Sequence, residues 1–146
     1  MALFLVFRDT ALRADEAWRR LTVWERHADV VPLTRIRVLT PPPRGAGTVF
    51  VARTGVGRLA FDDRMEVVVW RPPRDGAPGL CRLVKRGHLV LGWAEIEVRT
   101  ARGDGSQVMW REEVRVRGLP RIVDPLLGRA GRLMFGRAVN RLLARP

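Results

Sequence analysis

The feature that most constrains this chain is a series of short alternating segments between Leu33 and Arg117, separated by glycine- and proline-rich turns. Apolar and polar residues alternate within each segment, as in strands that bury one face. The turns are too short for helical crossovers, so the pattern predicts an antiparallel meander. The expected strands are Leu33–Leu39, Thr48–Thr54, Arg58–Trp70, Leu80–Arg86, His88–Thr100 and Gln107–Arg117.

Other patterns flank this meander. Leu3–Phe7 is an apolar run typical of a strand, Ala14 to Leu21 shows helical spacing, and Trp24 to Val31 predicts a second short helix ended by Pro32. After Gly118, helical spacing returns over a long amphipathic stretch, with apolar residues at Ile122, Val123, Leu126, Leu127, Ala130, Leu133 and Met134. We therefore predict one α+β domain over residues 1–146, in which a curved seven-stranded antiparallel sheet wraps around a long C-terminal helix.

The apolar stripe of this helix changes phase near Gly131 or Gly136. At 100° per residue, Phe135, Val139 and Leu142 point away from the stripe, while Arg137 and Arg141 come into phase with it. A glycine kink or an overhanging last turn would explain the change. Alternatively, Arg137 faces a polar pocket. The edge formed by Phe135, Val139 and Leu142 could pack on a second copy, which makes a homodimer conceivable.

The charge is strongly positive, with 27 basic against 15 acidic residues. All the basic residues except Lys85 are arginines, which is typical of a GC-rich bacterial genome, and they are scattered through every segment. Because no basic run or basic-aromatic motif appears, we do not expect a nucleic-acid function. A basic surface that docks an acidic protein, a nucleic acid or an anionic membrane remains an alternative, through Arg129, Arg132, Arg141 and Arg145.

Short apolar runs and few metal ligands limit the remaining classes. The apolar run near the start, Ala2 to Phe7, is shorter than a signal-peptide core or a membrane span, so we expect a cytoplasmic protein without an integral membrane segment. A single cysteine, Cys81, and two histidines do not make a disulfide or a zinc site. We expect no metal and no cofactor.

The order of elements and four local stretches resemble a known family. The stretches are Ala14-Asp15-Glu16-Ala17-Trp18-Arg19-Arg20-Leu21, Phe61-Asp62-Asp63-Arg64-Met65-Glu66-Val67, Gly92-Trp93-Ala94-Glu95-Ile96 and Trp110-Arg111-Glu112-Glu113. Together they resemble the START-like helix-grip superfamily, and within it the polyketide cyclase/dehydrase (SRPBCC) group. The resemblance implies a cavity between sheet and helix that takes a lipid, sterol, hormone or polyketide. Some members catalyse cyclisation or dehydration and others only carry a ligand.

Acidic residues interrupt two apolar strand faces. Asp63 shares a face with Phe61 and Met65, and Glu112 shares one with Trp110, so both carboxylates should point inward. Strand parity also places His88 inside if no bulge intervenes at Gly92. Pairing the hairpins about their turns sets Asp63 level with His88 and places Glu112 about six residues away, or roughly 20 Å. This predicts two polar spots.

Asp63 and His88 are the catalytic candidates. A carboxyl group in an apolar cavity has a raised pKa, and a neighbouring imidazole could exchange a proton with it, which would enolise or dehydrate a carbonyl chain. Ordinary pairing is the alternative: Asp63 and Glu112 would each pair with Arg53 or Arg137, and His88 would bond a backbone carbonyl.

The expected partner is a small hydrophobic ligand of polyketide, aromatic or lipid-like character. Glu112 and Arg137 would anchor a polar group of this ligand, and the expected apolar contacts are Phe61, Met65, Trp110, Leu126 and Ala130. A non-catalytic carrier or sensor with the same cavity remains the alternative to an enzyme.

Overall fold

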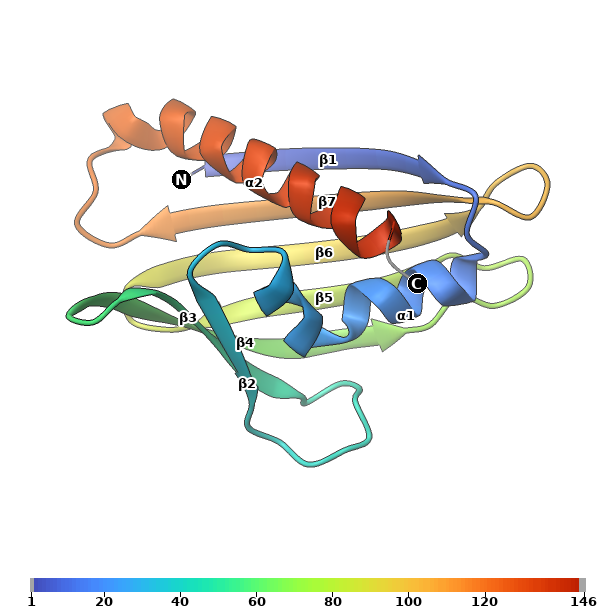
Figure 1. Ribbon diagram of the computed structural model, residues 1–146, viewed down its shortest axis with the longest axis horizontal. Coiled ribbons are helices and arrows are strands. Elements are labelled where there is room, and N and C mark those ends of the chain that lie inside the picture. The colour runs from blue at the N-terminus through green and yellow to red at the C-terminus, as the bar shows by residue number, and fades with distance from the viewer. Residues whose placement is uncertain (1, 145–146) are drawn as a thin grey trace.

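A seven-stranded antiparallel sheet forms the frame of the molecule, in the spatial order β1-β7-β6-β5-β4-β3-β2 (Figure 1). The computed structural model describes residues 2–144. The strands are β1 Ala2–Thr10, β2 Thr34–Val38, β3 Val49–Val56, β4 Leu59–Arg71, β5 Gly79–Arg86, β6 Val90–Thr100 and β7 Ser106–Val116. Every neighbouring pair is antiparallel, so the meander predicted from the turn signals is confirmed.

One long helix, α2 (Asp124–Ala144), lies across one face of this sheet, and α1 (Ala14–Thr22) lies beside its C-terminal end (Figure 1). Two short 3-10 helices, η1 (Trp24–Asp29) and η2 (Arg121–Val123), complete the chain. The second predicted helix is thus a 3-10 segment. Among residues 2–144, no helix combines the length and the apolar character needed to cross a bilayer.

The sheet's inner face follows the expected alternation. In β6, Val90, Ala94, Ile96 and Val98 are buried, and the register of β6 against β7 sets Val98 opposite Val108 at one end and Val90 opposite Val116 at the other. Val98 and Val108 are packed in the core. Val90 and Val116 instead line a cavity. The two ends of the sheet therefore differ in how they are filled.

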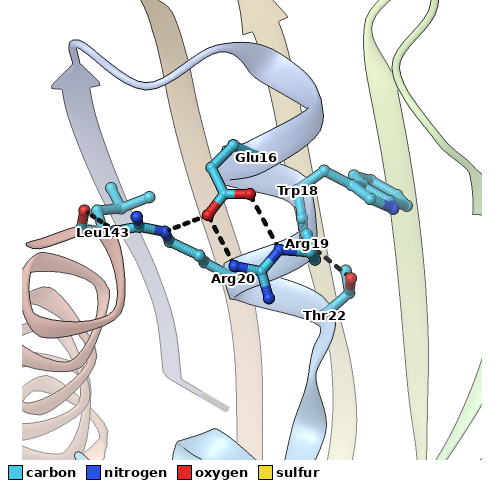
Figure 2. A network of polar contacts seen from close by, with 6 residues as sticks. All are labelled: Glu16, Trp18, Arg19, Arg20, Thr22 and Leu143. Carbon is cyan, nitrogen blue, oxygen red and sulfur yellow. Dashed lines mark hydrogen bonds and ion pairs between the residues drawn. The ribbon is translucent and has the colours of Figure 1, made fainter. Parts of the chain in front are cut away.

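At the packed end, α1 fastens the last turn of α2. Arg20 on α1 is buried and donates a hydrogen bond to the Leu143 carbonyl at 2.8 Å and another to Glu16 at 2.7 Å (Figure 2). The carbonyls of a helix's last turn have no partner within the helix, so this arginine satisfies one of them. Hydrogen bonds from Arg19 and Arg20 lower the pKa of Glu16 to about 2. Trp18 packs edge-on against Trp70 nearby, at 5.2 Å between ring centroids.

The buried face of α2 differs from the predicted one. Val139 and Leu142 are buried in the core, with Phe135 packed against it, whereas Leu126 and Leu133 are exposed. The predicted stripe is therefore right at Leu127, Ala130 and Met134, which line the cavity, and wrong at Leu126 and Leu133. The idea that Phe135, Val139 and Leu142 form an edge for a second copy is wrong. Glycines explain the error, because the contact face contains Gly128 and Gly131, which add no apolar signal. A Cβ on Gly131 would lie 2.6 Å from the Phe4 ring, so only glycine lets the helix come this close.

Candidate functional site

A cavity of about 270 Å³ lies between the sheet and the N-terminal half of α2. Its volume is just below the usual range for small-molecule pockets, which begins at about 300 Å³. The wall is almost wholly apolar, and its lining comes from all seven strands together with η1 and α2. The non-aromatic apolar residues that line the cavity are Val31, Ile36, Ala52, Met65, Leu83, Val90, Ala94, Val114, Val116, Leu127, Ala130, Gly131 and Met134.

Six rings form a continuous wall across the interior. Adjacent centroids along the series Phe4, Phe135, Trp110, His27, Trp24 and Phe50 lie 5.5, 5.2, 5.6, 5.8 and 4.8 Å apart. All six residues line the cavity. They come from β1, α2, β7, η1 and β3, so residues distant in sequence build one surface. This aromatic wall offers flat, rigid contact area suited to a planar or acyl ligand.

Opposite charges meet at a single ammonium inside the cavity. Lys85 Nζ lies 2.6 Å from Asp63 Oδ2 and 3.0 Å from Glu112 Oε1. The Lys85 and Glu112 side chains are each 3% exposed, and that of Asp63 is 14% exposed. Glu112 Oε2 also accepts a hydrogen bond from Trp110 Nε1 at 3.0 Å. Asp63, Lys85 and Glu112 thus form one buried polar cluster, where the sequence predicted two separate spots.

The strand register explains why the cluster forms. On one side of Lys85, Met65 of β4 is its direct partner. On the other side, Gly92 of β6 pairs with both Lys85 and Val114 of β7, so Lys85 stands level with Val114. Glu112 lies two positions from Val114 along β7. Extending the β4–β5 register places Asp63 two positions from Lys85 on the other side. The long lysine side chain spans this separation. The turn is centred between His88 and Leu89, because Arg86 pairs with Leu91, and not on Gly87 as assumed in the sequence prediction.

Strand β6 lies between Lys85 and Glu112, and its small residues leave space for the Lys85 side chain to reach Glu112. Gly92 carries no side chain at the level of Lys85, and Ala94, which is buried, pairs with both Leu83 and Glu112. Gly92 also has a φ of +129°, and a Cβ there would lie 1.9 Å from the Glu113 carbonyl oxygen. A larger residue at this point would both strain the backbone and obstruct the cluster.

The hydrogen bonds of the cluster leave one atom without a partner. The ammonium of Lys85 donates to Asp63, Glu112 and, at 3.9 Å, the Met65 sulfur, which uses its three N–H groups. Asp63 Oδ1 is buried and has no hydrogen-bond partner among residues 2–144. A buried oxygen of this kind is costly unless a proton or a ligand satisfies it.

Burial and neighbouring charges shift the pKa values of the cluster in a consistent way. Burial and the nearby Glu112 charge raise the pKa of Asp63, and burial is the larger of these two effects. The charge and hydrogen bond of Lys85 lower this pKa, but the net shift is upward. For Lys85, burial lowers the pKa, but attraction to Glu112 and Asp63 outweighs it, so the pKa is raised and Lys85 stays protonated.

His27 is a buried histidine on the aromatic wall. Its Nε2 lies 2.8 Å from the Leu21 carbonyl oxygen, which can only accept, so Nε2 carries the proton. Burial lowers the pKa of His27, against the hydrogen bond to Leu21 and the Glu112 charge. The ring is therefore neutral and its Nδ1 is an acceptor. The sequence prediction placed His27 on a short helix but assigned it no role in the site.

The structure brings together several of the residues predicted to contact a ligand. Asp63, Phe61, Met65, Trp110, Glu112 and Ala130 all line the cavity. The predicted pairing with arginine is wrong for both acids, since their partner is Lys85, while Arg53 pairs with Asp62 at 3.5 Å.

Three predicted site residues lie elsewhere. His88 is exposed in the β5–β6 turn, before β6 begins at Val90, so strand parity does not apply to it. Leu126 is 69% exposed and does not line the cavity. Arg137 is exposed on the outer face of α2. We therefore remove all three from the site, and the partner that the structure gives Asp63 is Lys85 in place of His88. Arg145 lies outside the described residues.

Sequence reasoning missed Lys85, although two signals pointed to it. It alternates with Cys81 and Leu83 on the inner face of β5, and it is the one lysine in a chain whose other basic residues are arginines. A flexible lysine chain ends in a compact ammonium, whereas arginine ends in a broad planar fork. Cys81 is fully buried, and burial raises the pKa of its thiol to about 12. Among residues 2–144, no cluster of His, Cys, Asp and Glu could hold a metal ion.

No protein-family model and no curated protein matches this chain. Solved structures do match it. A START superfamily protein from Mycobacterium smegmatis has a TM-score of 0.71 at 11% identity, over 98% of this chain and 97% of that chain. Norcoclaurine synthase from Thalictrum flavum has a TM-score of 0.67 at 16% identity, over 97% of this chain and 92% of that chain.

A third similar structure is the di-domain ARO/CYC protein BexL from the BE-7585A biosynthetic pathway. It has a TM-score of 0.69 at 11% identity, over 98% of this chain, which spans 45% of BexL. These likenesses, together with the curved sheet and the long terminal helix, show that the chain has the START-like helix-grip fold. The predicted fold class is thereby confirmed.

Proposed function

We propose that this protein binds a small, largely apolar ligand carrying a carbonyl group, and that Asp63 acts on that group as a general acid. The observation that carries the proposal is the unpartnered Asp63 Oδ1 in an apolar cavity, beside a lysine whose donors are already used. A polyketide-like or aromatic ketone fits the aromatic wall. Two proteins with this fold are named as ARO/CYC and synthase, which favours a catalytic reading.

Charge balance supports a protonated Asp63. With both acids ionised, the cluster would carry one uncompensated negative charge among apolar residues, which is expensive in a low dielectric. A proton on Oδ1 removes that charge without disturbing the bond from Lys85 to Oδ2. Lys85 and Glu112 then act as positioning residues, because they hold the carboxyl group with its free oxygen available to a ligand.

The chemistry requires no additional reactant. Asp63 Oδ1 donates its proton to the carbonyl oxygen of the ligand, and the carboxylate that forms takes a proton from the neighbouring carbon, giving an enol and restoring the acid. In a ligand with a second carbonyl group, the enol carbon could attack it and close a ring, while the rigid wall holds the chain folded. Loss of a hydroxyl group as water would follow the same proton transfers.

Deuterium exchange at the α-carbon of 2-tetralone tests the proposal, because this small bicyclic ketone suits the cavity and the exchange is followed by NMR. We expect the wild-type protein to accelerate exchange and Asp63→Asn to lose about 10²–10⁴-fold of that acceleration. Asp62→Asn, the exposed neighbour, is the matched control and should keep it. Retained acceleration in Asp63→Asn would exclude Asp63 as the acid.

A carrier without catalysis is the second candidate, favoured by the nearly all-apolar lining of the cavity. It predicts that 2-tetralone quenches the fluorescence of the cavity tryptophans, Trp24 and Trp110, but that exchange is not accelerated in any variant. Identifying what copurifies with the protein, by solvent extraction and mass spectrometry, would then name the cargo.

A further inference from the structure

The turns at one end of the sheet share an unusual composition. The register places the β3–β4 turn, the β5–β6 turn and the β7–η2 loop at the same end, and Figure 1 shows these turns together with the start of α2. Large apolar side chains project there into solvent: Val56, Leu59, Leu89, Leu119, Ile122 and Leu126. Leu59 is 87% exposed and Ile122 85%. We call this surface the open end.

Arginines accompany these apolar residues. Arg58, Arg117 and Arg121 are exposed in the same turns, and none of them makes an ion pair within residues 2–144. The segments 56–58, 87–89 and 117–122 contain no aspartate or glutamate. The start of α2 adds one acid, Asp124, which lies beside Arg117 and Arg121 and has an interaction partner of its own. The nearby Asp62 pairs with Arg53. The open end is thus both apolar and positively charged.

The opposite end provides an internal comparison. Its β4–β5 and β6–β7 turns carry arginine together with aspartate, as in Arg74 with Asp75 and Arg102 with Asp104. In the described part of the chain, neither turn exposes a large apolar side chain. The β2–β3 loop, also at the opposite end, exposes Leu39 at 41%. Exposed apolar and basic side chains therefore concentrate at the open end, and the net charge of +12 alone does not explain this.

We propose that the open end docks on an anionic lipid bilayer. Leucine and isoleucine side chains would enter the interface between headgroups and acyl chains, and the three arginines would contact lipid phosphates. A nucleic acid would satisfy the arginines but leave the exposed leucines and isoleucine in water. A bilayer satisfies both kinds of side chain, which is why the combined pattern favours it.

The cavity extends to the same end of the sheet. Val90, Val116 and Leu127 line the cavity and directly adjoin Leu89, Arg117 and Leu126 of the open end. Docking would therefore set the cavity against the bilayer, so that an apolar ligand could pass between them with little exposure to water. This proposal does not depend on catalysis by Asp63, because a carrier and an enzyme would both need to take up an apolar ligand.

Sedimentation with phosphatidylcholine vesicles, with and without phosphatidylglycerol, tests the proposal on the full chain. We expect binding to the anionic vesicles, reduced about fivefold by Arg121→Gln, since each basic residue near an anionic surface contributes about that factor. Ile122→Ser should reduce it at least as much. Arg102→Gln on the opposite end and Leu39→Ser on the β2–β3 loop are the controls, and both should bind like wild type.

Three results would overturn the proposal. One is no binding to anionic vesicles. Another is an equal loss in Arg102→Gln and Arg121→Gln, which would indicate diffuse charge attraction. The third combines two observations. Duplex DNA binds tightly, and this binding is weakened by Arg121→Gln but not by Ile122→Ser. Vesicle binding is also unchanged by Ile122→Ser, so the apolar residues contribute to neither. All of these measurements are independent of 2-tetralone exchange, so either proposal can fail alone.

Discussion

The two halves of α2 meet the same sheet in opposite ways. The C-terminal half buries Ala138, Val139, Leu142 and Leu143 in a dense core. The N-terminal half instead roofs the cavity through Leu127, Ala130, Gly131 and Met134. Phe135 marks the boundary, because it belongs to the aromatic wall. We refer below to the packed half and the hollow half of the interior.

Strand β7 repeats this division. Along its inner face, Val108 lies in the core, Trp110 in the aromatic wall, and Glu112, Val114 and Val116 in the cavity. A helix and a strand therefore change from packing to lining at the same wall. Close packing in one half leaves the other half free to keep an unfilled space and buried charges that a solid core would exclude.

Removing the lysine should show how much the hollow half depends on its charge balance. We expect Lys85→Met to lower the free energy of unfolding by about 3–5 kcal/mol at pH 8, because it removes the ammonium that neutralises the buried charge of the cluster, and the apolar wall offers no replacement. The loss should shrink at lower pH, where the carboxylates take up protons. Urea unfolding at both pH values measures it.

Arg86→Met, on the next and exposed residue, is the matched control and should change stability little. The triple variant Asp63→Asn, Lys85→Met, Glu112→Gln should recover most of the loss, since no charge is then stranded. If the triple variant were as unstable as Lys85→Met, lost packing and not charge would be the cause.

A pair of leucines on α2 compares the two halves directly. Leu142→Ala in the packed half should cost about 2–5 kcal/mol through lost burial and a new cavity. Leu126→Ala on the exposed face of the hollow half should cost less than about 0.5 kcal/mol. Equal losses in urea unfolding would contradict the division of the helix.

The sequence predicted the sheet well because its information is local. Turn residues and alternation specify where strands end and which face is buried, and the seven strands and the inward direction of Asp63 and Glu112 follow from them. The predictions that were wrong concern contacts between different helices and strands. The buried face of α2 was missed because Gly128 and Gly131 pack by closeness of backbones, not by apolar side chains.

The polar cluster was missed for a related reason. Its formation depends on the centre of one turn, at His88 and Leu89, and on small residues at Gly92 and Ala94 that let Lys85 reach across β6. A shift of the turn centre moves every cross-strand neighbour, so the approach of Asp63 and Glu112 to one ammonium could not be inferred from alternation alone.

The link between α1 and α2 offers a smaller perturbation of the packed half. Arg20→Met should lower stability by about 1–3 kcal/mol, because it leaves the Leu143 carbonyl without its donor. Arg19→Met removes a bond to the same Glu16 but from an exposed side chain, so it should cost less than about 1 kcal/mol. Thermal and urea unfolding should rank the two variants in this order, and the reverse order would mean that the Leu143 contact adds nothing.

The smallest expected effect is the pH dependence that Asp63 imposes. Because its pKa is raised in the folded state, the folded protein retains a proton that the unfolded chain loses above about pH 4. Stability relative to Asp63→Asn should therefore be highest below that pH, fall as pH rises, and level off above the folded pKa. Urea unfolding of wild type, Asp63→Asn and the control Asp62→Asn across this range measures the difference. A wild-type advantage that instead grew with pH would mean that the ionised pair with Lys85 outweighs burial, and Asp63 would then be an unsuitable acid.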